Sequence, residues 1–188
     1  MNNILRLTSP IPPSVNHHLE YRVMKKGNRS IVVAYKSLEQ KKYEKEFIPY
    51  VIDEAKKQRW EIDESGKQHY YNDWTVYFPR IDMDASNYDK VLCDSITESG
   101  VVWKDDNVVL NRVKKIYYDS KNPRIELEIK PVEYIGIFNS SEDFYEFENK
   151  CKKCSRYKRN CSILKKAKEG RIQNEIDNDF ICSKYKGE

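Results

Sequence analysis

The residues between 82 and 106 include four aspartates whose spacing could bring them around one point. Asp82 and Asp84 lie two residues apart, so in an extended segment their side chains point the same way. Asp105 and Asp106 follow a predicted helix. Converging carboxylates repel one another unless a cation neutralises them, and oxygen-only ligands favour Mg²⁺ or Mn²⁺. These four aspartates are therefore candidate ligands of a magnesium site.

Three polar residues between these pairs share one face of the predicted helix, because Asn87, Lys90 and Asp94 have spacings of three and four. A bound Mg²⁺ can hold a phosphate and lower the pKa of an attacking water. Lys90 could then approach the scissile phosphate or the charge that develops on it. The alternative is a chance cluster in a chain with 30 acidic residues, in which the aspartates form turns or a solvated loop.

Four of the five cysteines gather in the last forty residues. Cys151 and Cys154 form a C-x₂-C pair, and Cys161 and Cys182 follow. Four thiolates complete a tetrahedral Zn²⁺ site, and the same ligands hold iron–sulfur clusters. We expect Zn²⁺, with an iron–sulfur cluster as the alternative and four free thiols in a basic helix as a third hypothesis. Cys93 stands apart and is expected in the core.

The net charge of +4 conceals an asymmetry, since residues 150–186 carry 12 Lys and Arg against 4 Asp and Glu. A basic tail suits a polyanion such as nucleic acid, although a solvated lysine-rich surface explains it equally well. Further candidate phosphate contacts lie in the body of the chain. They are Lys25, Lys26, Arg29 and Arg80, together with Asn16, which could line the site from a proline-rich loop.

The elements that must position these residues are of both kinds. Alternating apolar residues predict strands at 4–7, 73–78, 108–118 and 124–130, and a hairpin from 17–23 and 30–34. Helices are expected at 37–59 and 87–98, the second with Ser86 as its N-cap, Asp89 at N3 and Gly100 beyond its end. The last two strands are expected to pair as antiparallel neighbours through residues 120–123. The fold class is thus α+β, a small mixed sheet packed against two main helices, plus a small helical four-cysteine tail.

The expected organisation is a nuclease domain at 1–132, a linker at 133–149 and a basic metal-binding module at 150–188. No apolar run approaches the roughly 20 residues that a membrane span needs, and no secretory signal is evident. We therefore expect a cytoplasmic protein without a membrane partner.

Two separated blocks of the sequence resemble the RusA family of Holliday junction resolvases, over residues 4–130. The first block is Pro12-Pro13-Ser14-Val15-Asn16. The second comprises Asp84-Ala85-Ser86-Asn87-Tyr88-Asp89-Lys90, then Asp94-Ser95-Ile96, Gly100, and Trp103-Lys104-Asp105-Asp106-Asn107-Val108-Val109. Their order and approximate spacing match the family signature, an acidic-x-Asp-Asn-x-x-Lys string followed by Asp-Ala-Leu, a Gly and an Asp-Asp pair.

The resemblance implies a Mg²⁺-dependent homodimer that nicks four-way junctions in recombination and repair, and a phage or prophage role would fit. Asp84 and Asp106 match the first and last catalytic aspartates, Lys90 the essential lysine and Asn87 the asparagine of the motif. Asp105 is the neighbouring acidic position. A two-fold symmetric junction calls for two equivalent active sites, which a C₂ dimer supplies.

One departure from the family concerns its second aspartate, because this chain has Ser86 there. A hydroxyl is a weak neutral ligand, so Asp82 is expected to substitute for it, or the site has lost a ligand. Two rival hypotheses stay open. One is a restriction-like nuclease that uses Asp84 with Glu128 and Lys130, and the other is a protein that binds branched DNA without cleaving it.

Overall fold

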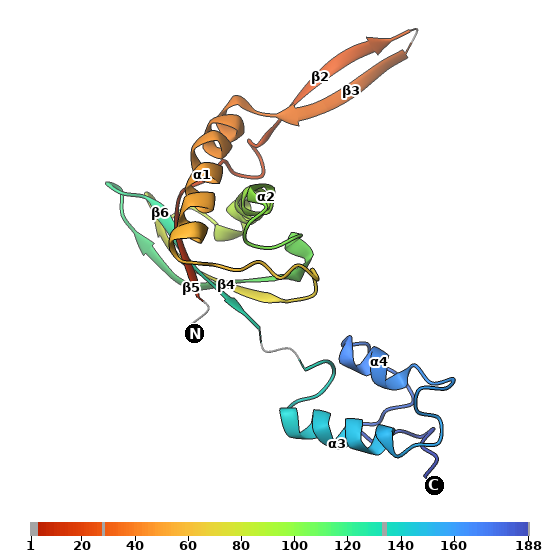
Figure 1. Ribbon diagram of the computed structural model, residues 1–188. Coiled ribbons are helices and arrows are strands. Elements are labelled where there is room, and N and C mark those ends of the chain that lie inside the picture. Colours follow the sequence, from red (N-terminus) through yellow and green to blue (C-terminus); the bar gives the residue numbers. More distant parts are fainter. Residues whose placement is uncertain (1–3, 28, 133–134, 188) are drawn as a thin grey trace. The chain divides into compact units, whose positions relative to one another are not determined.

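The computed structural model describes residues 4–27, 29–132 and 135–187, and it divides the chain into two compact units, Met1–Val132 and Glu133–Glu188. Each unit is considered by itself (Figure 1). Among the described residues, no helix has the length and apolar character needed to cross a bilayer.

The first unit is built on a four-stranded mixed sheet. Its strands are β1 (Leu5–Pro10), β4 (Tyr70–Phe78), β5 (Val109–Tyr118) and β6 (Arg124–Pro131), in the spatial order β1-β6-β4-β5. Leu127 lies opposite Leu7 on one side and Trp74 on the other, and all three are buried. Because side chains alternate along a strand, this register gathers the apolar side chains of three strands on one face.

Two helices cover that face of the sheet (Figure 1). Helix α1 (Leu38–Lys57) begins at Ser37, whose side chain accepts a hydrogen bond from the Gln40 N–H, and it buries Phe47 and Val51. Helix α2 (Asp89–Ser99) packs against α1 and ends at Gly100, which has the left-handed φ of 69° expected of a residue that ends a helix. The α+β class and the two-helix layer predicted from the sequence are confirmed.

Strands β2 (Leu19–Lys26) and β3 (Arg29–Lys36) form a separate antiparallel hairpin. In Figure 1 it extends away from the helices as a two-stranded arm. Lys25, Lys26 and Arg29 are exposed near its turn. The hairpin predicted from the sequence is present, with longer strands than expected.

The second unit contains α3 (Ser141–Lys152) and α4 (Ile163–Lys168). Its core is small, with Phe138, Phe147 and Ala167 fully buried and partly buried apolar residues around them. Gly136 has a φ of 74°, and a Cβ at that position would lie 2.2 Å from the Ala167 carbonyl oxygen. Glycine is therefore required where the chain crosses the end of α4.

Two local expectations are wrong. Strands β5 and β6 do not pair, because β4 lies between them and β5 runs parallel to β4. Ser86 does not cap α2: a 3₁₀ turn, Ala85–Tyr88, precedes the helix and places Tyr88 at the N-cap. The linker expected at 133–149 stays a prediction; most of α3 and part of the second core lie in this segment, and its residues 133 and 134 lie outside the described residues.

Candidate functional site

The segment that follows β4 turns sharply at Asp84. The Asp84 carboxylate accepts a hydrogen bond from the Ser86 N–H, with Oδ1 and N 3.0 Å apart, and so caps the 3₁₀ turn. Ala85 and Tyr88 of this turn are buried, and the Tyr88 ring lies 5.6 Å from the ring of Phe78. Apolar anchors thus hold the turn against the sheet, while Asp84 and Ser86 stay exposed.

A pocket opens between this turn and the edge of the sheet. Its polar lining consists of Asp84, Ser86, Asp89 and Asn111, and its apolar lining of Trp74, Met83, Ala85, Val113 and Ile116. The polar lining offers oxygen donors, two of them carboxylates. Mg²⁺ commonly uses one or two carboxylates and completes its shell with water and phosphate. The donor chemistry of the pocket therefore fits a hard divalent cation.

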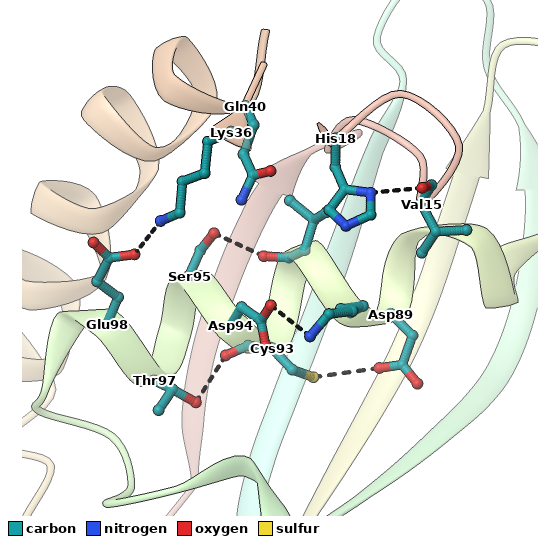
Figure 2. A network of polar contacts seen from close by, with 12 residues as sticks. Val15, His18, Lys36, Gln40, Asp89, Cys93, Asp94, Ser95, Thr97 and Glu98 are labelled. Atoms are coloured by element: carbon teal, nitrogen blue, oxygen red, sulfur yellow. Dashed lines mark hydrogen bonds and ion pairs between the residues drawn. The ribbon is translucent and has the colours of Figure 1, made fainter. Parts of the chain in front are cut away.

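Asp89, which sequence reasoning treated as a helix-capping residue, is held in this pocket by a hydrogen-bonded chain. Its Oδ1 accepts from the Asn111 side-chain amide at 2.7 Å and from the Cys93 thiol at 3.3 Å. Figure 2 shows the Cys93 contact along α2. Asn72 donates to Asn111 at 2.8 Å from within the core. The side chain of Asp89 is therefore positioned from β4 and β5 as well as from its own helix.

Lys90 and Asp106 lie close together beside α2. The Lys90 Nζ forms an ion pair with Asp94 at 2.9 Å, which the i,i+4 spacing on one helical face explains. This bond, with Asp106 nearby, raises the pKa of Lys90 and keeps it charged. Burial and the carboxylates of Asp94 and Asp105 raise the pKa of Asp106. The positive charge of Lys90 lowers this pKa and so partly offsets the increase.

Cys93 connects the two groups of acidic residues. Burial raises the pKa of its thiol well above the ordinary range, and the neighbouring charges of Asp89 and Asp106 add to that effect. Asp89 is hydrogen-bonded to this thiol, and Asp106 interacts with it electrostatically. Across residues 4–27, 29–132 and 135–187, however, no three or more His, Cys, Asp or Glu side chains are arranged to hold a metal ion.

Two of the candidate ligands form other contacts. Asp82 forms an exposed ion pair with Arg80, with Oδ1 and Nε 3.1 Å apart, and does not line the pocket. Asp105 accepts a hydrogen bond from the Asn107 N–H and caps the 3₁₀ turn Asp106–Val108. The contact of Asp105 is that of a turn-forming aspartate, the alternative that the sequence left open, whereas Asp82 forms a surface ion pair.

The proline-rich loop meets the acidic turn directly. The Val15 N–H donates to the Asn87 carbonyl oxygen at 2.8 Å, so the two blocks of the resemblance are adjacent in space. Asn16, next to Val15, is exposed. The loop thus contacts the turn that follows Asp84, and whether Asn16 lines the site stays a prediction.

The residues of the restriction-like alternative are engaged elsewhere. Glu128 forms an ion pair with Arg6 at 3.1 Å. Lys130 pairs with the buried Asp73 at 3.1 Å. Neither lines the pocket beside Asp84, so the contacts give this alternative no support.

The four cysteines of the tail are electrostatic neighbours within the second unit. Burial, followed by the charges of Cys182, Cys161 and Cys154, raises the pKa of Cys151 to about 11. Hydrogen bonds from the backbone N–H groups of Lys186 and Arg156 lower the pKa of Cys154. The thiols lie near one another, although they are not arranged as a closed site among the described residues.

Sequence reasoning missed the roles of Asp89 and Asn111. Asp89 belongs to the motif string itself, but it was interpreted as a helix-capping residue and was therefore not named as a candidate site residue. Asn111 could not be found, because its place depends on the pairing of β5 beside β4, where it lies opposite Asn72.

The comparison with protein families identifies a known nuclease family. The family model described as Endodeoxyribonuclease RusA matches residues 10–130, which is more than half of the chain. A search of curated proteins found no match. The matched span contains the proline-rich loop, the Asp84 pocket and the Lys90–Asp106 group, and the family consists of nucleases that resolve Holliday junctions. This chain therefore belongs to the RusA endodeoxyribonuclease family.

Proposed function

We propose that this chain cleaves four-way and other branched DNA, with a divalent ion, Mg²⁺ or Mn²⁺, held at the Asp84 pocket and beside Asp106. The observation that supports it is the pocket of oxygen donors next to Lys90, inside the span that matches the nuclease family. When bound, the ion would polarise the scissile phosphate and supply a water of lowered pKa.

The protein's own groups would orient and neutralise the substrate. Lys90 keeps its positive charge because Asp94 and Asp106 raise its pKa, so it can face a phosphate oxygen or the developing charge. Asp94 would aim that amine through their 2.9 Å ion pair. Asn87, whose backbone fixes the proline-rich loop, would help to shape the entry to the site.

DNA contacts would come from exposed basic side chains. Lys25, Lys26 and Arg29 near the hairpin turn, Arg80 beside the acidic turn and the nearby Asn16 are the candidates. Phosphate contacts dominate affinity and make it depend on salt. A homodimer would present two such sites to the two halves of a junction, and a nuclease acting on DNA would work in the cytoplasm.

Cleavage of a synthetic four-way junction in Mg²⁺ tests the proposal and separates it from its rivals. We expect the wild type to nick the junction, Asp106→Asn to lose cleavage, and Glu128→Gln to keep it. Loss on Glu128→Gln with retention on Asp106→Asn would support the restriction-like alternative. Tight binding by the wild type with no cleavage would support a protein that binds branched DNA without cutting it.

We further propose that Cys151, Cys154, Cys161 and Cys182 bind Zn²⁺, with an iron–sulfur cluster as the alternative. Their mutual proximity and the N–H groups directed at Cys154 support a site that gathers thiolates, because such hydrogen bonds stabilise the charged form. Metal analysis of the purified protein tests it. Stoichiometric zinc without visible absorption supports zinc, iron with inorganic sulfide supports the cluster, and absence of both contradicts a metal site.

The basic residues of this unit would grip DNA. Lys165 and Lys166 lie on α4 beside the small core. Replacing both with alanine should weaken junction binding and flatten its dependence on salt. An unchanged slope would instead favour a protein partner for the tail.

A further inference from the structure

The acidic turn of this chain departs from its family at one position. Ser86 lies where the second aspartate of the motif is expected, and a hydroxyl cannot neutralise a cation. Asp82, the substitute that the sequence suggested, pairs with Arg80 and does not line the pocket. The pocket nevertheless contains a second carboxylate, that of Asp89.

The carboxylate of Asp89 is oriented as a ligand would be. Both of its hydrogen-bond donors, the Asn111 amide and the Cys93 thiol, reach the same oxygen, Oδ1. Within the described chain, its other oxygen is left for another partner. Asp89 is the first residue of α2, where the helix dipole favours negative charge. This side chain is therefore a preorganised anion on the wall of the pocket.

The chain of hydrogen bonds behind Asp89 follows from the strand register. Asn72 and Asn111 are opposite each other on β4 and β5, so their side chains share the face that α2 covers. The Asn72 amide donates to Asn111 Oδ1, and the Asn111 amide donates to Asp89. Partners of this kind fix the orientation of ligating carboxylates in metal sites.

Asp89 also connects the pocket to the other acidic group. The Cys93 thiol that donates to Asp89 has Asp106 as a second electrostatic neighbour. Asp89 therefore shares the pocket with Asp84 and accepts a hydrogen bond from a thiol that also interacts electrostatically with Asp106. A carboxylate at this place can serve where Ser86 cannot.

We propose that Asp89 supplies the carboxylate that Ser86 lacks, so that Asp84 and Asp89 hold the divalent ion together, with Asn111 as the residue that positions Asp89. The inference rests on the proposed nuclease function and deepens it. It assigns the missing ligand to the start of α2 instead of to Asp82.

Binding of Mn²⁺ to the full-length protein, followed by electron paramagnetic resonance, tests it without any need for turnover. Asp89→Asn keeps the Oδ1 acceptor and should weaken Mn²⁺ affinity tenfold or more, the scale expected when a ligand environment is disrupted. Adding Ser86→Asp to that variant should restore affinity to within about threefold. Asp53→Asn, which removes an exposed charge from α1, is the matched control and should bind as the wild type does.

Anomalous diffraction from wild-type crystals soaked in Mn²⁺ locates the bound ion without any variant. We expect anomalous density within about 2.4 Å of carboxylate oxygens of both Asp84 and Asp89, close to the usual distances for such ions. Density at Asp84 without contact to Asp89, or unchanged affinity in a folded Asp89→Asn variant, would overturn the inference.

The positioning role of Asn111 is tested by Mn²⁺ binding in two backgrounds. Asn111→Ala should weaken Mn²⁺ binding in the wild-type background and have little effect once Ser86→Asp is present. An equal loss in both backgrounds would contradict a role exerted through Asp89. A wild type that neither binds Mn²⁺ nor cuts junctions would instead refute the proposed nuclease function, which keeps the two failures distinct.

Discussion

The two units of this protein differ in what can hold them together. The nuclease unit buries a large apolar core under two helices, including Trp74, Phe47 and Ile96. In the described part of the second unit the buried core residues are Phe138, Phe147 and Ala167, and Cys151 interacts electrostatically with the other three thiols. Short domains with small cores usually need a metal or disulfide to be stable. Packing alone can thus position a carboxylate pocket, whereas the proposed metal would add stability that the small core of the tail lacks.

Removing the proposed metal should have the largest effect, and the effect should differ between the two units. Structural Zn²⁺ binds with an apparent free energy on the order of 10–16 kcal/mol, which in such domains is folding energy. We expect chelation, or Cys151→Ser, to expose the second unit to proteolysis while leaving the nuclease unit resistant. Limited proteolysis with mass spectrometry measures both at once. A metal-free second unit that resists digestion would show that its small core suffices.

A core truncation should have the complementary effect on the first unit. Leu127 is 1% exposed between Leu7 and Trp74, so Leu127→Ala should cost about 2–5 kcal/mol. Urea unfolding followed by the fluorescence of the three tryptophans, all of which lie in this unit, measures it. Leu110→Ala, at a position 44% exposed on β5, is the control and should cost under about 1 kcal/mol. Equal costs at the two positions would contradict the packing argument.

A glycine substitution tests how closely the small core of the second unit is packed. An alanine Cβ at Gly136 would meet the Ala167 carbonyl oxygen, in addition to straining a positive φ. Gly136→Ala should therefore destabilise the second unit by more than the roughly 1–2 kcal/mol that left-handed backbone alone costs. Gly100→Ala, with a similar φ and open space around it, provides that reference in the first unit. Thermal unfolding followed by the NMR amide signals of each unit measures the destabilisation in the two variants.

Acid should affect the first unit through Asp73. Burial opposes ionisation of this carboxylate, but hydrogen bonds from Arg112 and Lys130 outweigh it and lower its pKa. The contribution of ionised Asp73 to the free energy of unfolding is thus complete above the pKa of about 3.9 that this group has in the unfolded chain. It is lost as pH falls through the lower pKa that the group has in the folded protein. We expect Asp73→Asn to cost on the order of 1–3 kcal/mol at neutral pH and to flatten the acid limb of stability. An unchanged acid limb in urea titrations would assign that dependence to other carboxylates.

Much of the fold could be predicted from local pattern. The buried alternation of Ile125, Leu127 and Ile129 and the helix end at Gly100 are both determined by residues close in sequence. The strand order could not be predicted, because a short connection between β5 and β6 suggests neighbours and only tertiary packing inserts β4 between them. Asn111 lies opposite Asn72 only because β5 pairs with β4, so its contact with Asp89 could not be predicted from the sequence either.

The candidate site also has some features that the sequence could predict and others that it could not. Asp84, Lys90 and Asp106 could be named from the motif, and the structure places Asp84 on a pocket and Lys90 beside Asp106. Asp82 and Asp105 fit the acidic pattern equally well, yet their contacts are an exposed ion pair and a turn. Asp84 also caps a turn, so spacing alone cannot tell which turn-capping carboxylate lines a pocket as well.

The most direct test of the nuclease assignment is a pair of readings on Asp84→Asn. Single-turnover cleavage of a four-way junction in Mg²⁺ should fall by about 10²–10³ or more, because the variant loses a ligand of the ion that would neutralise the reacting phosphate. Junction affinity without a divalent ion should stay within about threefold of the wild type, since phosphate contacts elsewhere carry binding. Cleavage by Asp84→Asn at the wild-type rate would contradict the assignment of this pocket as the site of DNA hydrolysis.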